Sequence, residues 1–317
     1  MNVWRAATEL ARSGQRAALA TIAETRGSTP VPAGEKMLVG PAGRLVGTVG
    51  GGCVEAEVIA AALAAHQDGV PRLITQHLNA DLAGDLGLSC GGTVEIFVEP
   101  VLHTPDYLAV LDQAAQAATG IVRTATIWDG GAVKTFEAGR RAGGPAASLS
   151  ADRRTMTELL TAPPRVIVFG AGHVGAAIAR AAAAAGFRVV VVDDRPEFAD
   201  ASRFDDDVAV VCAGVDHALA AHPLTAADAV VIATRGHRHD AVILSKVAAS
   251  PADYVGLLGS KRKKAVITKA LLTAGLPQAA LHRVKVPVGL DIGAVTAEEI
   301  AVSVVAELVA WRRRSTV

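Results

Sequence analysis

A glycine-rich turn between an apolar strand and an alanine-rich helix is the feature that most restricts how this chain can fold. The motif Gly-Ala-Gly-His-Val-Gly at residues 170–175 follows the apolar run 166–169 and opens a helical pattern over 174–185. In such a turn the first glycine permits the tight bend, the second lets the backbone approach a phosphate, and the third lets the helix pack on the strand. The helix N-terminus adds N–H donors and partial positive charge. The motif therefore predicts a phosphate-binding site at Gly170, Gly172, His173 and Gly175.

Strands and helices alternate along the C-terminal half of the chain. Strand-like runs are expected at residues 166–169, 188–192, 208–211, 229–233 and 254–258, with helical patterns between most of them. This alternation predicts a parallel sheet with helices on both faces, and the continuous valines at 189–192 fit a strand that is covered on both sides. We therefore expect an α/β protein whose C-terminal domain is a Rossmann-type doubly wound parallel sheet.

The N-terminal half is predicted to form a second α/β domain with a mixed sheet. Helical patterns are expected at residues 2–13, 54–66 and 107–118. Strand-like runs are expected at 17–23, 36–39, 45–49, 72–77, 93–98 and 124–128. The segment 137–163 contains several glycines, serines and arginines and has the composition of a linker. The expected domains are therefore residues 1–136 and 164–317.

Polar side chains follow several of the C-terminal strands, at the edge of the sheet where the glycine motif lies. Asp193 and Asp194 come roughly 20 residues after the motif, where an acidic side chain can accept a hydrogen bond from a ribose 2′-hydroxyl. Arg195 could instead pair with a phosphate. Further candidates stand in the loops after the later strands: Arg235, His237, Ser260, Lys261 and Asp291. We expect Lys263 and Lys264 to lie on a solvated helix face. In the alternative interpretation, the glycines only shape the turn and His173 faces solvent.

Two of the three cysteines stand beside glycines. Cys53 follows Gly50, Gly51 and Gly52 at the expected start of a helix, and Cys90 precedes two glycines. A thiol in this position leaves room for a bulky partner to approach the sulfur. Each could ligate a soft metal such as molybdenum, carry sulfur as a persulfide, form a redox pair or be structural, and the sequence does not choose among these roles. Cys212 follows a run of valines and is expected to be an inert buried thiol.

The composition excludes several classes of partner and favours a cytoplasmic protein. The 317 residues carry 31 Lys and Arg and 31 Asp and Glu, so the formal net charge is +0, and only 3% of residues are aromatic. We expect neither nucleic acid nor a membrane as a partner, because the chain has no basic excess, few rings for base stacking and no long uncharged apolar run. Charged residues interrupt the first thirty positions, so no signal peptide is expected. An odd number of scattered cysteines is typical of a reducing compartment.

These motifs, together with several others, resemble the XdhC/CoxI family of xanthine dehydrogenase and carbon monoxide dehydrogenase accessory factors. The resemblance covers nearly the whole chain. In the N-terminal half it rests on Gly-Ser-Thr-Pro at 27–30, Gly-Thr-Val-Gly-Gly-Gly-Cys-Val-Glu at 47–55 and Cys-Gly-Gly-Thr-Val-Glu at 90–95. In the C-terminal half it rests on the glycine motif, Asp-Asp-Arg-Pro at 193–196, Arg-Gly-His at 235–237, Gly-Leu-Leu-Gly-Ser at 256–260 and Gly-Leu-Asp-Ile-Gly-Ala at 289–294. One mild departure is Ala297, where family members often have proline.

The resemblance implies a maturation factor rather than a catalyst. Such a chaperone would bind molybdenum cofactor (molybdopterin, with or without a dinucleotide extension), protect it while a cysteine desulfurase partner supports its sulfuration, and deliver it to an apo-molybdoenzyme of the xanthine dehydrogenase type. It also implies a homodimer. A phosphorylated pterin suits the glycine-rich turn, and the Cys53 thiol suits a contact with molybdenum.

Two other functions remain open from the sequence. A Rossmann-type turn followed by an acidic residue is typical of NAD(P)-dependent oxidoreductases. Against this function, no acid–base pair is evident in the sequence that would serve a hydride transfer. The other alternative is a non-catalytic module that senses a nucleotide and docks another protein.

Overall fold

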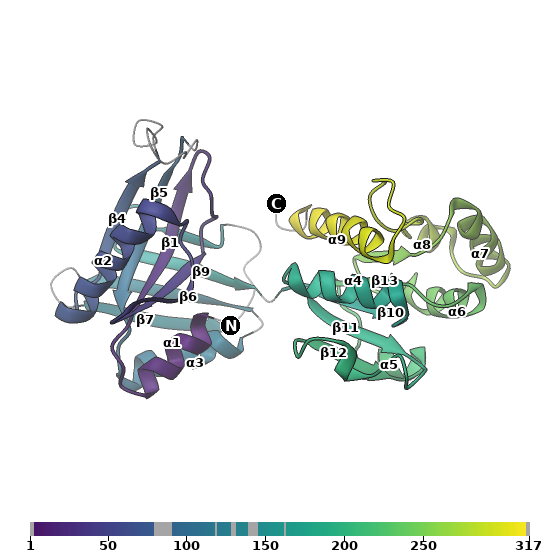
Figure 1. Ribbon diagram of the computed structural model, residues 1–317, viewed down its shortest axis with the longest axis horizontal. Helices are drawn as coiled ribbons and strands as arrows, with labels where there is room; N and C mark the ends of the chain where they lie inside the picture. Colours follow the sequence, from purple (N-terminus) through teal and green to yellow (C-terminus); the bar gives the residue numbers. More distant parts are fainter. Residues whose placement is uncertain are drawn as a thin grey trace. The chain divides into compact units, whose positions relative to one another are not determined.

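The chain folds into two compact units, Met1–Ala162 and Pro163–Val317, as a computed structural model shows (Figure 1). The structure describes residues 3–78, 91–117, 119–127, 131–138, 145–161 and 163–314. Each unit has hydrophobic clusters of its own.

The N-terminal unit contains two antiparallel sheets. The five-stranded sheet has the order β3-β2-β1-β5-β4, with β1 at Ala18–Arg26, β2 at Lys36–Gly40, β3 at Gly43–Gly47, β4 at Arg72–His77 and β5 at Thr93–Pro100. The four-stranded sheet has the order β7-β6-β9-β8, with β6 at Thr119–Ile127, β7 at Gly131–Ala138, β8 at Ala147–Leu149 and β9 at Thr155–Thr161. Every ladder between these described strands is antiparallel, where the sequence suggested a mixed sheet. Short hairpin connections such as β2–β3 and β6–β7 favour this arrangement, because parallel neighbours need long crossovers.

The described part of the N-terminal unit also has three helices: α1 at Val3–Arg12, α2 at Gly52–Asp68 and α3 at Pro105–Gln116. The alternation of side chains along β1 explains their placement. Ala20 and Ile22 belong to the cluster that α2 covers, whereas Leu19 belongs to the cluster formed with α1 and α3. The five-stranded sheet is therefore buried on both faces.

The predicted linker at residues 137–163 is wrong for most of its described part. Strand β9 pairs with β6 along its whole length, and β8 pairs with β9. Met156 and Glu158 on β9 are both almost fully buried, so this segment belongs to the core of the N-terminal unit. Its glycines and arginines gave it the composition of a linker, although Thr155–Thr161 alternates between inward and outward side chains as a half-buried strand does. The division between the units falls after Ala162.

Two ion pairs are buried between the sheets of the N-terminal unit. Lys134 on β7 pairs with Glu99 on β5 at 2.5 Å, and both side chains are fully buried. Lys36 on β2 pairs with Glu158 on β9. Both lysine ammonium groups lie over the Trp4 ring, 4.8 Å and 5.2 Å from its centroid. These cross-sheet pairs leave each charge with an opposite partner, which a buried charge requires.

Burial opposes ionisation in this cluster. It lowers the pKa of Lys36, because loss of hydration outweighs the attraction of Glu158. It also raises the pKa of Glu99 against the attraction of Lys134, and raises the pKa of Tyr107, whose hydroxyl donates to Glu99 at 3.3 Å. The charged state of the cluster therefore depends on every partner being present.

The C-terminal unit has one parallel sheet, which confirms the predicted Rossmann-type fold. Its order is β12-β11-β10-β13-β14, with β10 at Arg165–Phe169, β11 at Arg188–Asp193, β12 at Val208–Cys212, β13 at Asp228–Ile232 and β14 at Tyr254–Leu257. All four ladders are parallel. The strand order reverses direction at β10 and β13, and ligands bind at the carboxyl edge of such a switch point.

Helices cover both faces of this sheet. Helices α4 (His173–Ala184) and α9 (Ala297–Arg314) pack on one face. The opposite face carries α5 (Val215–Ala221), α6 (His237–Val247), α7 (Lys261–Thr273) and α8 (Gln278–His282). A short 3-10 helix, η2 (Ala201–Arg203), lies between β11 and β12. Alternate residues of β10 pack on opposite faces, Val168 toward α4 and Phe169 toward α6.

Candidate functional site

Two glycines of the motif at residues 170–175 are required by the fold itself. Gly170 has φ +105°, and a Cβ atom there would lie 2.4 Å from the carbonyl oxygen of Ala233. At Gly175 a Cβ atom would lie 1.8 Å from the carbonyl oxygen of Gly170. These contacts are too close for any side chain, so Gly170 allows β10 to approach β13 and Gly175 allows α4 to approach the turn.

Gly172 is different, because nothing in the fold requires a glycine there. Its φ of −64° suits any residue, and a Cβ atom would meet no other described atom within 4 Å. It is the N-cap of α4 but supplies no side chain to cap the helix, so the first N–H groups of α4 remain available. The space beside Gly172 is open to a ligand that approaches the backbone closely. His173, the first residue of α4, is exposed.

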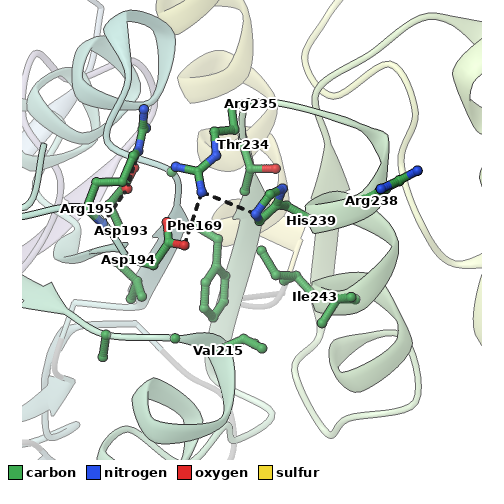
Figure 2. Close-up of a pocket in the computed structure, with 15 residues that line it drawn as sticks. Phe169, Asp193, Asp194, Arg195, Val215, Thr234, Arg235, Arg238, His239 and Ile243 are labelled. Atoms are coloured by element: carbon green, nitrogen blue, oxygen red, sulfur yellow. Dashed lines mark hydrogen bonds and ion pairs between the residues drawn. The ribbon is translucent and has the colours of Figure 1, made fainter.

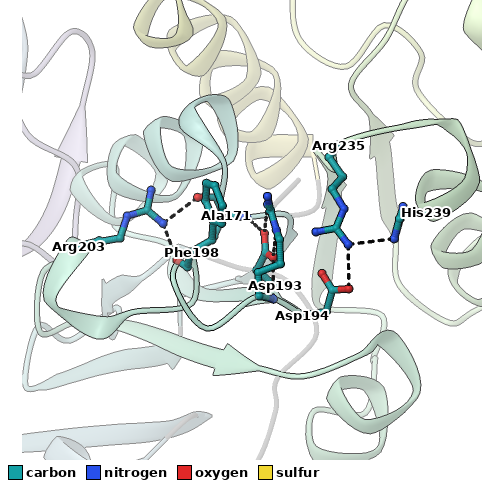
Figure 3. Close-up of polar contacts among 8 residues, drawn as sticks. Ala171, Asp193, Asp194, Phe198, Arg203, Arg235 and His239 are labelled. Carbon is teal, nitrogen blue, oxygen red and sulfur yellow. Dashed lines mark hydrogen bonds and ion pairs between the residues drawn. The ribbon is translucent and has the colours of Figure 1, made fainter.

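The turn is held from both sides of Ala171 (Figure 3). A carboxylate oxygen of Asp193 accepts from the backbone N–H of Ala171 at 2.8 Å. Arg203 donates to the carbonyl oxygens of Ala171 at 3.0 Å and Phe198 at 2.5 Å. Arg195 donates to both oxygens of Asp193 at 2.9 and 3.0 Å, and its guanidinium lies 3.6 Å from the Phe198 ring centroid. The turn is therefore preorganised, which lowers the cost of ordering it around a ligand.

The carboxylate of Asp193 stabilises this turn. From the sequence, it was predicted to accept from a ribose hydroxyl. Its carboxylate is 6% exposed and accepts from Ala171 and from both the backbone and the side chain of Arg195. Burial alone would raise its pKa, but the hydrogen bonds from Arg195 and Ala171 outweigh burial and lower the pKa. Arg195 likewise uses Nε and one terminal nitrogen to bind Asp193, and its contact with a phosphate stays a prediction. The neighbouring Asp194 is exposed.

Replacing Asp193 with asparagine is expected to destabilise the C-terminal unit by about 1–3 kcal/mol at neutral pH, because charged hydrogen bonds to the turn are lost. The lowered pKa means that this stabilisation is present above the unfolded pKa of about 3.9 and is lost as the pH falls through the lower pKa of the folded state. The difference from wild type should therefore shrink in acid. Urea unfolding, with hydrogen exchange of β10 and β11 peptides, measures it. A difference that persists unchanged in strong acid would contradict this role, and Asp206→Asn, an exposed site before β12, is the control.

A pocket of about 230 Å³ lies beside the turn at the carboxyl ends of β10 to β13. Residues of α6 form one of its walls (Figure 2). Its polar side is a chain of three groups. Arg235 donates to Asp194 at 3.2 Å and lies 3.3 Å from Nε2 of His239. The pocket is lined by Phe169, Gly170, Val192, Asp193, Asp194, Arg195, Ala213, Gly214, Val215, Thr234, Arg235, Arg238, His239, Val242 and Ile243. The structure therefore brings Gly170, Asp193, Asp194, Arg195 and Arg235 of the predicted site together.

Ser260, one of the candidate residues predicted in the loops after the strands, has a structural contact at the start of α7. The hydroxyl of Ser260 caps α7 by accepting from the backbone N–H of Lys263. Lys263 was predicted to lie on a solvated helix face, and this prediction is wrong. Its ammonium group forms an ion pair with the fully buried Asp240 at 2.5 Å and donates to the Leu258 carbonyl oxygen. Asp240 also accepts from the hydroxyl of Thr234 at 2.6 Å. Lys264 likewise reaches a backbone carbonyl, that of Val284 at 3.4 Å.

Other predicted residues lie outside the pocket or outside the described side chains. Ser260 and Asp291 are not among the residues that line the pocket, and Asp291 is exposed in the loop before α9. The side chains of His237 and Lys261 are not among those described, although each begins a helix, α6 and α7 respectively. The structure does not assign them a contact.

The glycine segments of the N-terminal unit lie close to one another. Gly50, Gly51 and Gly52 have φ of +132°, +79° and +60°, and α2 begins at Gly52 without a side-chain cap. A Cβ atom on Gly27 would lie 3.2 Å from the Gly91 carbonyl oxygen, and one on Gly50 would lie 3.5 Å from Pro30. The segment at 27–30 thus adjoins both glycine runs that flank the cysteines.

The cysteines themselves are only partly described. The backbone of Cys53 belongs to the first turn of α2, but its side chain and the whole of Cys90 lie outside the described part of the chain. Cys212 is exposed, so the prediction that it is buried is wrong. Strand β12 is the edge strand of its sheet, and its residues after Val208 are less buried than those of the central strand β13.

Comparison with known proteins identifies the family. Residues 10–77 match the family model of the XdhC and CoxI family, and residues 166–308 match that of the XdhC Rossmann domain. A probable xanthine dehydrogenase subunit of Bacillus subtilis (strain 168) is 32% identical over 324 residues, which cover 96% of this chain and 95% of the relative. The chain belongs to the XdhC/CoxI family.

Two further similarities extend over nearly the whole of this XdhC/CoxI protein. The molybdenum cofactor insertion chaperone PaoD of Escherichia coli (strain K12) is 29% identical over 324 residues, covering 98% of the chain and 88% of the relative. The crystal structure of a xanthine dehydrogenase from Bacillus halodurans aligns with a TM-score of 0.80 at 27% identity, covering 99% of this chain and 96% of that one. The relatives therefore connect the family to molybdoenzymes.

The described residues of this XdhC/CoxI protein offer neither a membrane-spanning helix nor a metal-binding cluster. Of the helices described, none has both the length and the hydropathy to cross a bilayer. Within the same residues, no three His, Cys, Asp or Glu side chains gather closely enough to hold a metal ion.

Sequence analysis missed two residues that shape the site of this XdhC/CoxI protein. Arg203, in η2, donates a hydrogen bond to the Ala171 carbonyl oxygen of the turn. It was missed because so short a helix has no periodic sequence pattern. Asp240 was visible only as one of several polar residues after β13. Its position in the first turn of α6, six residues after the loop residue Thr234, was the signal that could have suggested a structural hydrogen bond.

Proposed function

We propose that this XdhC/CoxI protein is a molybdenum cofactor chaperone, which protects the cofactor during sulfuration and delivers it to a xanthine dehydrogenase-type molybdoenzyme. The observation that carries the proposal is the preorganised turn with the open Gly172, in a chain that aligns with a molybdenum cofactor insertion chaperone over nearly its whole length. A phosphorylated pterin carries the anionic group that such a turn binds. We further propose a homodimer and a cysteine desulfurase partner, as the family resemblance implies.

The residues of the turn have separate parts in this function. Gly172 and the first N–H groups of α4 bind the phosphate end of the cargo, with His173 beside them. Asp193 and Arg203 hold the Ala171 peptide and act through the turn rather than by touching the cargo. Because these groups are already in place, binding requires little rearrangement.

Cys53 is proposed to contact the molybdenum of the cargo during transfer. A thiolate is a soft ligand that suits molybdenum. The positive φ values of Gly50, Gly51 and Gly52 and the open space around the last two leave the start of α2 accessible to a bulky group. Cys90 is a second candidate, since its glycine neighbours adjoin the same segment at 27–30.

The test is purification of the full-length protein from cells that make the cofactor, followed by release and identification of any bound pterin. The same preparation is added to apo-molybdoenzyme, and the restored activity is measured. We expect bound pterin and activation of the enzyme. Absence of both would contradict the proposal.

Replacing Cys53 with serine is expected to lower enzyme activation at least about tenfold, because a serine hydroxyl is a poor ligand for a soft metal. Cys212→Ser is the matched control, since Cys212 is an exposed thiol of the other unit and should leave activation unchanged. If the Cys53→Ser protein binds pterin and activates the enzyme as the parent does, the thiol has no part in transfer.

A nicotinamide dinucleotide remains a second candidate ligand, because the pocket presents Asp194 after the second strand of the sheet. An NAD(P)-dependent oxidoreductase would turn over a small substrate with consumption of the dinucleotide. A nucleotide-sensing module would bind the dinucleotide without turnover and without an effect on activation of the molybdoenzyme. The reconstitution described above separates both alternatives from the chaperone, and an assay of dinucleotide consumption separates them from each other.

A further inference from the structure

We propose that a second copy of this chain docks on the C-terminal unit at the β14 edge of its sheet, with an acidic, apolar surface of each copy on a basic surface of the other. The first surface, the loop face, consists of Leu290, Asp291, Ile292, Val295, Glu298 and Val302. The second, the helix face, consists of Arg262, Val266, Lys269 and Leu272 on α7. The inference rests on the proposed function in that it names the surfaces of the proposed homodimer.

Opposite charges are separated along this part of the chain, although the formal net charge of the whole chain is +0. Residues 254–285 contain no Asp or Glu, and their Lys and Arg residues are Lys261, Arg262, Lys263, Lys264, Lys269, Arg283 and Lys285. Residues 286–311 contain no Lys or Arg, and their acidic residues are Asp291, Glu298, Glu299 and Glu307. A neutral molecule with two such regions carries the charge complement of each on its own copies.

The loop face presents apolar side chains to water on a fixed backbone (yellow, before α9, in Figure 1). Val295 is 83% exposed, yet its backbone N–H donates to Glu299 at 2.8 Å. Leu290 is held beside α9 by Ser303, whose hydroxyl donates to the Leu290 carbonyl oxygen at 2.5 Å. Exposed apolar side chains that lie close together and are rimmed by charges are typical of an interaction surface.

The helix face carries positive charge where a helix disfavours it. Helix α7 begins with basic residues only, 261–264, beside the positive end of its own dipole. One of them pairs with Asp240, but Arg262 and Lys269 are exposed and form no ion pair with any residue that the structure describes. Val266 lies one turn from each of them and is 58% exposed. Carboxylates of a second copy would reduce this repulsion while its apolar side chains cover Val266.

The two faces flank the same edge of the parallel sheet. Strand β14 ends the sheet order, and Lys285 pairs alongside it by donating to the Val255 carbonyl oxygen at 2.9 Å. Helix α7 packs on one side of the sheet and α9 on the other. A twofold axis at this edge can set the loop face of each copy on the helix face of the other, so that every contact is made twice.

The test is sedimentation velocity of the full-length protein over a series of concentrations. The loop variant, Asp291→Lys with Glu298→Lys, and the helix variant, Arg262→Glu with Lys269→Glu, should each dimerise at least about tenfold more weakly than the parent, because like charges then face each other. An equimolar mixture of the two variants should form a mixed dimer about as tight as that of the parent, since both of its contacts again join opposite charges.

Two further variants separate the charges from other effects. Val295→Ser keeps every charge and changes only an exposed side chain, and it should weaken the dimer at least about tenfold because each contact loses a buried apolar group. Asp206→Lys with Asp207→Lys is the matched control. These exposed carboxylates precede β12, at the opposite edge of the sheet, and their reversal should leave dimerisation unchanged.

The outcomes separate this inference from the proposed function. A mixture that does not associate overturns the two faces. A dimer that every variant forms as tightly as the parent also overturns them, and leaves the proposed homodimer in place. A parent that stays monomeric overturns both. Variants that dimerise normally but no longer activate the molybdoenzyme assign the loop face to the recipient protein and overturn this inference. Dimerisation that follows the charges, in a protein that neither carries pterin nor activates the enzyme, supports the two faces and contradicts the chaperone function.

Discussion

Replacing Gly175 with alanine is expected to destabilise the C-terminal unit by about 3 kcal/mol or more, because the new methyl group would overlap the carbonyl oxygen of Gly170. The backbone of the turn would have to move away from α4. Urea unfolding of the full-length protein, with hydrogen exchange of peptides from β10 and α4 to identify the affected unit, measures the loss.

Gly172→Ala is the matched comparison in the same turn. Its methyl group enters open space, so the expected loss of stability is about 1 kcal/mol or less, the cost of alanine at a helix N-cap. The affinity for a phosphorylated ligand should nevertheless fall at least about tenfold, because the methyl group keeps the ligand from the backbone amides. Calorimetric titration with a nucleoside diphosphate or with isolated pterin cofactor measures it. Equal stability losses for the two variants would contradict the close packing described at Gly175. Undiminished binding by Gly172→Ala would show that the ligand does not approach this turn.

Replacing Lys134 with methionine is expected to destabilise the N-terminal unit by about 3–5 kcal/mol, because Glu99 would be left as a buried charge without its partner. The double variant Lys134→Met with Glu99→Leu should recover most of this stability, since it removes both charges. Differential scanning calorimetry of the full-length protein measures each variant.

The control for this cluster lies on the same strand. Glu137 on β7 pairs with Arg123 at 2.7 Å, but both side chains are largely exposed. Glu137→Gln should therefore cost no more than about 1 kcal/mol. A similar effect of Lys134→Met and Glu137→Gln would mean that the Lys134–Glu99 pair is not shielded from water.

The parallel sheet could be predicted closely from the sequence because its strands are buried on both faces. The run at 188–192 became β11 at Arg188–Asp193, and the run at 166–169 became β10 at Arg165–Phe169. Continuous apolar residues between helical patterns leave few alternatives. Strands β8 and β9 were not predicted, because the glycines and arginines around them gave the segment the composition of a linker.

The candidate site could be predicted only in outline. The glycine motif located the turn, because its three glycines permit a tight bend, the approach of a phosphate and the packing of the helix on the strand. The roles of Asp193 and Asp194 could not be separated, because adjacent residues at a strand end project in different directions and only the folded turn shows that Ala171 engages the first. The exposure of Cys212 depended on β12 being an edge strand, which is a property of sheet order and not of local sequence.

The ion pair between Asp240 and Lys263 links two loops of the C-terminal unit. Asp240 lies in the first turn of α6, beside the pocket, and Lys263 lies in the first turn of α7. Thr234, at the end of β13, is tied to the same carboxylate. The beginnings of α6 and α7 are therefore held to each other and to the residues after β13 through one buried carboxylate, so loss of Asp240 would free both helix starts at once.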